Sequence, residues 1–122
     1  LSLRTKNIDQ VYEITGHNIL VMYIIKRNKV IISQLLMRGA NINFVFPFNG
    51  YTPLHWAIQE GVNSKIVKFL IKNGAYQHAV DNNGVDCCEK SLENERYKDV
   101  TDLVNQYCKY HPELRKNAKQ MY

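Results

Sequence analysis

The chain has 122 residues, of which 45% are apolar and 22% are charged, a composition typical of one globular domain. Its longest apolar runs, such as residues 21–25, are far too short to cross a bilayer, so no membrane segment is expected. The formal net charge of +5 is concentrated in residues 1–50 and 109–122, and no basic run is interleaved with aromatic side chains, so the sequence does not favour nucleic acid as a partner.

The three cysteines indicate free thiols in a reducing, intracellular compartment, either cytoplasm or nucleus. Cys87 and Cys88 are adjacent and Cys108 leaves the number odd, which does not suit a disulfide framework. Together with His111 they lack the spacing of a zinc site. No metal and no cofactor are therefore expected. The chain also begins without Met or a leader, as a piece of a longer protein would.

Glycines mark an internal repeat. Gly16, Gly50 and Gly84 follow one another at intervals of 34 residues. Aligning residues 16–43 with residues 50–78 matches Leu20 with Leu54, Leu35-Leu36 with Leu70-Ile71, and Gly39-Ala40 with Gly74-Ala75. One inserted residue is needed near residues 62–64. A third copy starts at Gly84 and keeps fewer of the repeated residues, as a terminal capping unit would.

Each unit has the pattern of two helices. In the middle unit Thr52 can cap a first helix that starts at Pro53, and the apolar residues of 64–72 share one helical face. Asn18 and Asp86 hold the capping position of Thr52 in the other units, and Glu89 completes a pattern like that of a capping box. A last helix is expected from about residue 97 to residue 110, before Pro112.

The repeated apolar positions predict one elongated core that runs across the units. Its members are Leu3, Leu20, Ile31, Leu35, Leu36, Leu54, Ala57, Ile66, Val67, Leu70, Ile71, Val100, Leu103 and Val104.

The hexapeptide TPLHWA at residues 52–57 identifies a resemblance, because it fits the TPLHxA motif of ankyrin repeat proteins. The resemblance covers about residues 3–107, whereas the Trp, Leu-Gly and Tyr pattern of tetratricopeptide repeats is absent. It implies an all-α solenoid of stacked helix-turn-helix units with projecting hairpin loops. The expected divisions are the end of a preceding repeat or an N-terminal cap at 1–13, repeats at 14–47 and 48–81, a degenerate capping repeat at 82–110, and a basic tail at 111–122.

The first unit departs from the motif. Ile19 and Val21 replace the Pro and His, and Tyr23 stands where a small Ala is expected. If residues 1–13 are the end of a repeat whose remainder is missing, the face with Val21, Met22 and Tyr23 is partly uncovered, and copies of the chain are expected to associate through it. If they are a native cap, the chain is expected to be monomeric.

Nothing in the sequence brings a nucleophile together with a His and an acid, and there is no glycine-rich phosphate loop. The chain is therefore not expected to be an enzyme or to take a small-molecule substrate. The resemblance implies that His55 is structural and bonds to the backbone of a loop. His17 and His78 are expected at the surface, and Trp56 is expected to pack between units.

The resemblance implies a protein-interaction scaffold that binds a partner protein through its hairpin loops and the exposed positions of its first helices. By family position, the binding residues are Ile14, Thr15, His17, Ile25, Lys26, Phe46, Phe48, Asn49, Tyr51, Gln59, Glu60, Asn82, Asn83, Val85, Glu93 and Asn94. The alternative is a regulatory or substrate-recruiting segment of a larger enzyme, such as an acyltransferase or ligase.

The loop NFVFPFNG at residues 43–50 is unusually apolar for a turn. In an extended loop Phe44, Phe46 and Phe48 would share one face. Phe44 could pack inward, but Phe46 and Phe48 are expected to be exposed anchors for the partner. The family resemblance also implies that Asn43 and His78 hold a loop position at which an asparaginyl hydroxylase could act.

Overall fold

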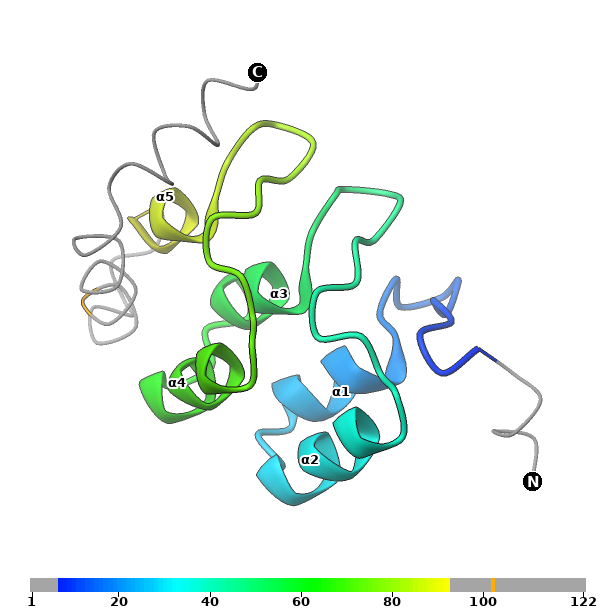
Figure 1. Ribbon diagram of the computed structural model, residues 1–122. Coiled ribbons are helices and arrows are strands. Elements are labelled where there is room, and N and C mark those ends of the chain that lie inside the picture. The colour runs from blue at the N-terminus through cyan, green and yellow to red at the C-terminus, as the bar shows by residue number, and fades with distance from the viewer. Residues whose placement is uncertain (1–6, 93–101, 103–122) are drawn as a thin grey trace.

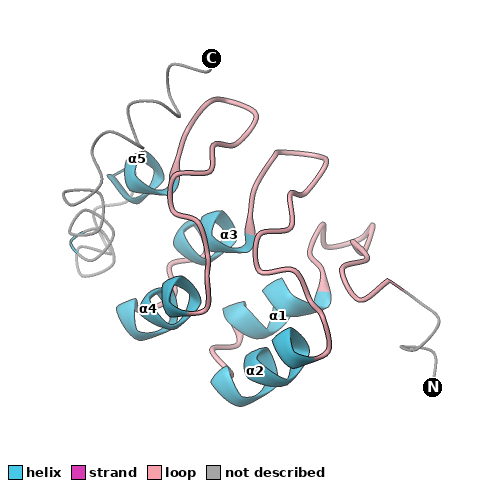
Figure 2. Ribbon diagram, in the orientation of Figure 1, coloured by secondary structure: helices cyan, strands magenta, loops and turns pink. Residues whose placement is uncertain are grey.

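Two consecutive antiparallel helix pairs and one further helix make up the described part of the chain (Figure 1). The computed structural model describes residues 7–92 and residue 102. The helices of this part are α1 (Ile19–Ile25), α2 (Lys29–Met37), α3 (Pro53–Gln59), α4 (Ser64–Lys72) and α5 (Cys87–Leu92), separated by loops (Figure 2). Within the same residues, β-pairing is limited to one bridge between Val80 and Asp86. The expected all-α repeat architecture is confirmed.

The helices form two layers (Figure 1). Helix α3 packs against α1, α4 and α5, and α1 also packs against α2. We call the row of α1, α3 and α5 the inner layer, and α2 with α4 the outer layer. A loop precedes each inner helix, and these three loops project on one side of the stack: finger 1 (residues 11–17), finger 2 (residues 45–51) and finger 3 (residues 80–86). The tight loops from α1 to α2 and from α3 to α4 lie at the helix ends remote from the fingers.

A short polar side chain caps the N-terminus of every helix for which a cap was predicted. The side chain of Asn18 accepts a hydrogen bond from Val21 N at 3.0 Å, and that of Asp86 accepts one from Glu89 N at 2.9 Å. Asn28 and Asn63 cap α2 and α4 in the same way. Because each cap satisfies an otherwise free backbone N–H, these residues fix where the helices start.

One core runs through both layers. Of the predicted members, Leu20, Leu35, Leu54, Ala57, Ile66, Val67 and Leu70 are buried, and Ile31, Leu36 and Ile71 are partly buried against them. The core is completed by residues that were not predicted: Ile24, Ile32, Ala40, Ile58, Val62, Ala75 and Cys87. The predicted members Leu3, Val100, Leu103 and Val104 lie outside the described residues, as does the helix expected at 97–110.

The side chains of Val21, Met22 and Tyr23 in the first unit are more deeply buried than the sequence suggested. Val21 is fully buried, and Met22 and Tyr23 are partly buried. Val21 holds in α1 the position that His55 holds in α3, and Tyr23 packs against the core. The expectation that Val21 lies on an uncovered face is therefore wrong.

His55 joins α3 to finger 3. Its Nδ1 accepts hydrogen bonds from Thr52 N at 3.1 Å and lies 2.9 Å from Thr52 Oγ1. Since Nδ1 accepts from a backbone N–H, Nε2 carries the proton and donates to Val85 O at 3.0 Å. Desolvation by burial lowers the pKa of His55 from 6.5. The expected structural role of His55 is confirmed.

The centre of the core offers a direct test of the stacked architecture. Leu70→Ala removes a fully buried side chain between the layers and should lower the free energy of unfolding by about 2 to 5 kcal/mol. Met37→Ala truncates an exposed side chain on the neighbouring helix and should change it by less than about 0.5 kcal/mol. Urea unfolding of both variants measures the difference, and equal effects would contradict the described core.

The neutral state of His55 predicts a pH dependence. Because its pKa is lower in the folded than in the unfolded chain, its contribution is complete above pH 6.5 and is lost as the pH falls through and below that value. The loss is at most about 1.4 kcal/mol per pH unit, which corresponds to one proton. His55→Gln retains His17 and His78 and should therefore be less stable at neutral pH but show a flatter decline. Urea midpoints at a series of pH values compare the two proteins, and parallel curves would argue against a buried neutral His55.

Candidate protein-binding surface

Fingers 1 and 2 are closed by the same two backbone hydrogen bonds. Tyr12 N donates to His17 O and Gly16 N donates to Tyr12 O, both at 2.8 Å. In finger 2 the corresponding bonds join Phe46 to Tyr51 and Gly50 to Phe46, also at 2.8 Å. In finger 3 the equivalent bonds join Asp81 to Val85 and Gly84 to Asp81, both at 3.0 Å, and each closes a loop with one residue fewer. The first two fingers are therefore matched in shape, and the third is not.

Amide and carboxylate side chains tie the base of each finger to the next unit. Asn43 donates from Nδ2 to Gly74 O at 3.0 Å and accepts from Tyr76 N at 2.9 Å. Asp9 holds the same position one unit earlier and accepts from Asn41 N at 2.9 Å. These bonds cross between units, so they hold neighbouring fingers at a fixed separation.

One equivalent position at the tips of the fingers is occupied by Ile14, Phe48 and Asn82. Asn82 bonds finger 3 to finger 2, because its N donates to Asn49 O at 2.9 Å and its Nδ2 to Phe48 O at 3.3 Å. Gly50 makes this approach possible, since a Cβ there would lie 2.7 Å from Asn82 N. The side chains of Ile14 and Phe48 have no polar group that could make the second of these bonds. No hydrogen bond between fingers 1 and 2 is present among the described residues.

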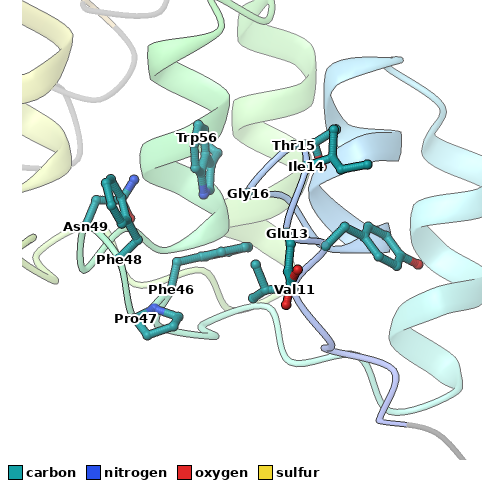
Figure 3. A pocket seen from close by; sticks show the side chains of 11 residues that line it. Val11, Glu13, Ile14, Thr15, Gly16, Phe46, Pro47, Phe48, Asn49 and Trp56 are labelled. Carbon is teal, nitrogen blue, oxygen red and sulfur yellow. The ribbon is translucent and has the colours of Figure 1, made fainter.

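A pocket of about 510 Å³ opens between fingers 1 and 2 (Figure 3). Phe46 points across it from finger 2 toward Val11, and Trp56 of α3 lies at its inner end. The exposed side chains of Ile14 and Phe48 stand at its two edges. The complete lining is Val11, Tyr12, Glu13, Ile14, Thr15, Gly16, Phe46, Pro47, Phe48, Asn49 and Trp56.

Trp56 is held in place by a set of edge-to-face ring contacts. Its ring centroid lies 4.7 Å from that of His17, 5.1 Å from that of Tyr51 and 5.8 Å from that of Phe46. Its indole Nε1 is buried and has no acceptor among the described residues. An indole donor without an acceptor therefore lies beside the pocket.

Phe46 corrects the expectation for finger 2. It was expected to be an exposed anchor, but its side chain is 1% exposed, whereas that of Phe48 is 94% exposed. The two closing hydrogen bonds of Phe46 make the chain turn at residues 47–49, so the alternation of an extended strand ends there. Phe46 then packs between Phe44 and Trp56, and of these three phenylalanines only Phe48 remains exposed. Phe44 is partly buried, as the inward alternative required.

His78 was expected at the surface and is instead buried, with 1% of its side chain exposed. Its position corresponds to that of Asn43, at the junction between a finger and the stack. The ring of Tyr76 lies against it, with centroids 5.7 Å apart. The expectation is wrong because a residue at the base of a finger faces the neighbouring unit rather than water.

Several predicted binding residues surround the pocket or support it. Ile14, Thr15, Phe48 and Asn49 line it, and His17 supports Trp56. Tyr51 is partly buried, stacks on His55 and accepts a hydrogen bond from Lys90 Nζ at 2.6 Å. Tyr51 therefore links finger 2 to α5, and its contact with a partner remains a prediction.

The remaining predicted residues lie apart from the pocket. Lys26, Gln59 and Glu60 are exposed and Ile25 is partly buried, all at the ends of α1 and α3 remote from the fingers. Asn82, Asn83 and Val85 belong to finger 3, where Asn82 and Asn83 are exposed and Val85 binds His55 through its carbonyl. Glu93 and Asn94 lie outside the described residues.

The expected set did not include Val11, Tyr12, Glu13 and Trp56, which line the pocket. A signal for the first three was present in the sequence. Tyr12 precedes Gly16 by the same four residues as Phe46 precedes Gly50, so residues 12–16 could have been read as a finger of the same form.

Hydroxylation of Asn43 and His78 remains a prediction, with a structural consequence. Both polar atoms of the Asn43 amide bond to the next unit, and His78 is buried. A hydroxylase would therefore need the local structure to open before it reached either side chain.

The described residues offer little for covalent or metal chemistry. Burial raises the pKa of the Cys87 thiol, and the negative charge of Asp86 raises it further. The thiol is therefore protonated and unreactive at neutral pH. Among the described residues, no group of three or more His, Cys, Asp or Glu side chains is placed to hold a metal ion. None of the described helices is long and apolar enough to span a bilayer.

Comparisons with known proteins agree with the geometry. A family model for ankyrin repeats in three copies matches residues 2–81. The chain is also similar to the ADP-ribosylation factor GTPase-activating protein AGD4 of Arabidopsis thaliana, with 35% identity over 66 residues. Those residues make up 54% of this chain but only 8% of that relative, so the similarity covers a small part of a much longer protein.

Proposed function

This chain belongs to the ankyrin repeat family, whose members generally mediate protein–protein interaction, and from this premise we propose that it holds a partner protein in the pocket between fingers 1 and 2. The rigid spacing of the two fingers supports the proposal. Asn43 and Asp9 fix the finger bases, so the pocket exists before a partner arrives and binding need not order the loops.

The observation that carries the proposal is the exposure of two large apolar side chains at the pocket edges. Ile14 is 99% exposed and Phe48 is 94% exposed. A hydrogen-bonding Asn occupies the equivalent position of finger 3 and joins it to finger 2. The side chain of Asn82 helps to join finger 3 to finger 2. The apolar side chains of Ile14 and Phe48 make no such bond, and they serve a contact outside the chain. Exposed aromatic and aliphatic residues around a preformed pocket are typical of the centre of an interface.

The lining also indicates the chemistry of the partner. Glu13 is the one charged residue in it, and the other side chains are apolar, aromatic or uncharged polar. An apolar side chain of the partner would fill the space beside Phe46 and Trp56. A Lys or Arg next to that side chain would face Glu13, which favours a partner segment that combines an apolar anchor with a basic neighbour.

A second candidate function is a recruiting or regulatory segment within a larger enzyme. It is favoured by the similarity to a GTPase-activating protein of which the matched residues form only 8%. On this proposal the same pocket captures a substrate or regulator for a catalytic region elsewhere in the protein. The sequence of the complete gene distinguishes the two candidates, because only the second requires such a region.

The pocket can be tested without knowledge of the natural partner. Peptides selected from a random display library on the purified chain should contain a bulky apolar residue beside Lys or Arg. Phe48→Ser should weaken their binding by about thirtyfold, the equivalent of roughly 2 kcal/mol for an interface anchor. Fluorescence polarisation with a labelled peptide measures the affinity, and the melting temperature should be unchanged because Phe48 is exposed.

Val45→Ser is the matched control, since it replaces an exposed apolar residue of the same finger that does not line the pocket. It should leave the affinity within about twofold of the original. If Val45→Ser weakened binding as much as Phe48→Ser, or if no peptide were enriched, the pocket would not be the binding site.

A further inference from the structure

The positive charge of the stack gathers on its outer layer. Between residues 14 and 80 the single acidic residue is Glu60. The basic residues of the same range are all exposed, and each lies on α2, on α4 or at a helix end in the adjoining loops: Lys26, Arg27, Lys29, Arg38, Lys65, Lys68 and Lys72. On α4 the three lysines are spaced by three and four residues, so they form one row opposite the buried Ile66, Val67 and Leu70.

The acidic residues of the described part lie mainly on the other side. Asp9 and Glu13 belong to finger 1 and its base, Asp81 and Asp86 belong to finger 3, and Glu89 lies on α5. The fold therefore separates the charges into an acidic and apolar finger side and a basic outer layer. Such a separation gives the outer layer a field that attracts polyanions.

A hollow of about 500 Å³ marks the centre of the basic region, where α2 and α4 begin. Lys26, Arg27, Lys29 and Lys65 line it, together with Asn28, Val30, Asn63 and Ile66, and no acidic side chain contributes. Arg27 is held there by hydrogen bonds from its guanidinium to Ile25 O at 3.0 Å and to Gly61 O at 3.5 Å. Lys29 Nζ lies 5.7 Å from the centre of the Phe69 ring.

Two apolar side chains accompany these charges. On α2, Val30 is 67% exposed and Met37 is 87% exposed. They are seven residues apart and so lie on the same side of the helix. A surface for single-stranded nucleic acid would be expected to present exposed aromatic residues for stacking. The aromatic residue of α2 and α4 is Phe69, which is partly buried against the core.

We propose that the outer layer docks on an anionic membrane surface. The basic row of α4 and the residues around the hollow would face lipid phosphate and carboxylate groups, while Val30 and Met37 would enter the boundary between headgroups and acyl chains. Basic residues beside exposed apolar ones are the combination by which proteins bind the interface of an anionic bilayer without spanning it. Docking in this way leaves the fingers free, so the membrane proposal is independent of the proposed function of the pocket.

Flotation of the whole chain with lipid vesicles tests the proposal. It should bind vesicles of phosphatidylcholine with phosphatidylserine and not vesicles of phosphatidylcholine alone. The triple variant Lys65→Gln, Lys68→Gln, Lys72→Gln should bind about a hundredfold more weakly, because each basic residue near an anionic bilayer strengthens binding by roughly fivefold. The variant Arg115→Gln, Lys116→Gln, Lys119→Gln has the same change in net charge and should bind nearly as well as the original. Equal losses in the two variants would overturn the proposal, since net charge alone would then explain binding.

The apolar residues separate a membrane from other polyanions. Val30→Ser with Met37→Ser should weaken vesicle binding several-fold and leave binding to heparin unchanged, whereas Val45→Ser on finger 2 should alter neither. All of these side chains are exposed, so the melting temperatures should agree. Failure to bind the mixed vesicles, or tighter binding to RNA or duplex DNA at the same salt concentration, would overturn the proposal.

Discussion

The hydrogen bonds of His55 are the constraint on which the middle of the structure depends. One ring nitrogen fixes the first turn of α3 through Thr52, and the other binds Val85 in finger 3. Since α3 contacts α1, α4 and α5, this residue sets the position of finger 3 relative to the whole stack. In α1 the equivalent position is Val21, which is buried but has no hydrogen-bonding group. Finger 2 relies instead on Asn43 at its base and on the packing of Phe46 against Trp56.

Most of the fold could be predicted from the sequence because it depends on local, repeated features. The glycine period, the TPLHWA motif, the capping residues and the apolar face of residues 64–72 each specify a helix or its end without long-range information. The finger side chains could not be predicted in this way. An extended strand would place Phe46 and Phe48 together, but the bond from Gly50 N to Phe46 O turns the chain and separates them. His78 was misplaced for a related reason, since whether a loop residue is buried depends on the unit that stacks against it.

The separation of charge on the surface could not be predicted from the sequence either, because it depends on where the fold places each helix and loop. Counted along the chain, the lysines of α4 and the acidic residues of finger 3 nearly cancel. In the folded protein they lie on different sides, because α4 belongs to the outer layer and finger 3 projects from the inner one. Two surfaces with different chemistry result. The pocket between fingers 1 and 2 is apolar with one carboxylate, and the outer layer is basic with two exposed apolar residues.

The most direct test of the pocket uses Trp56, because it is the single tryptophan of the chain and lies at the inner end of the pocket. In a nuclear magnetic resonance titration with a peptide selected on the chain, its indole N–H signal is resolved from those of the backbone. This signal should shift progressively as the pocket fills, together with the backbone amides of residues 11–16, 46, 48 and 49. If the indole signal stayed in place while the amides of finger 3 or of α2 moved, the partner would bind elsewhere and the pocket would not be the binding site.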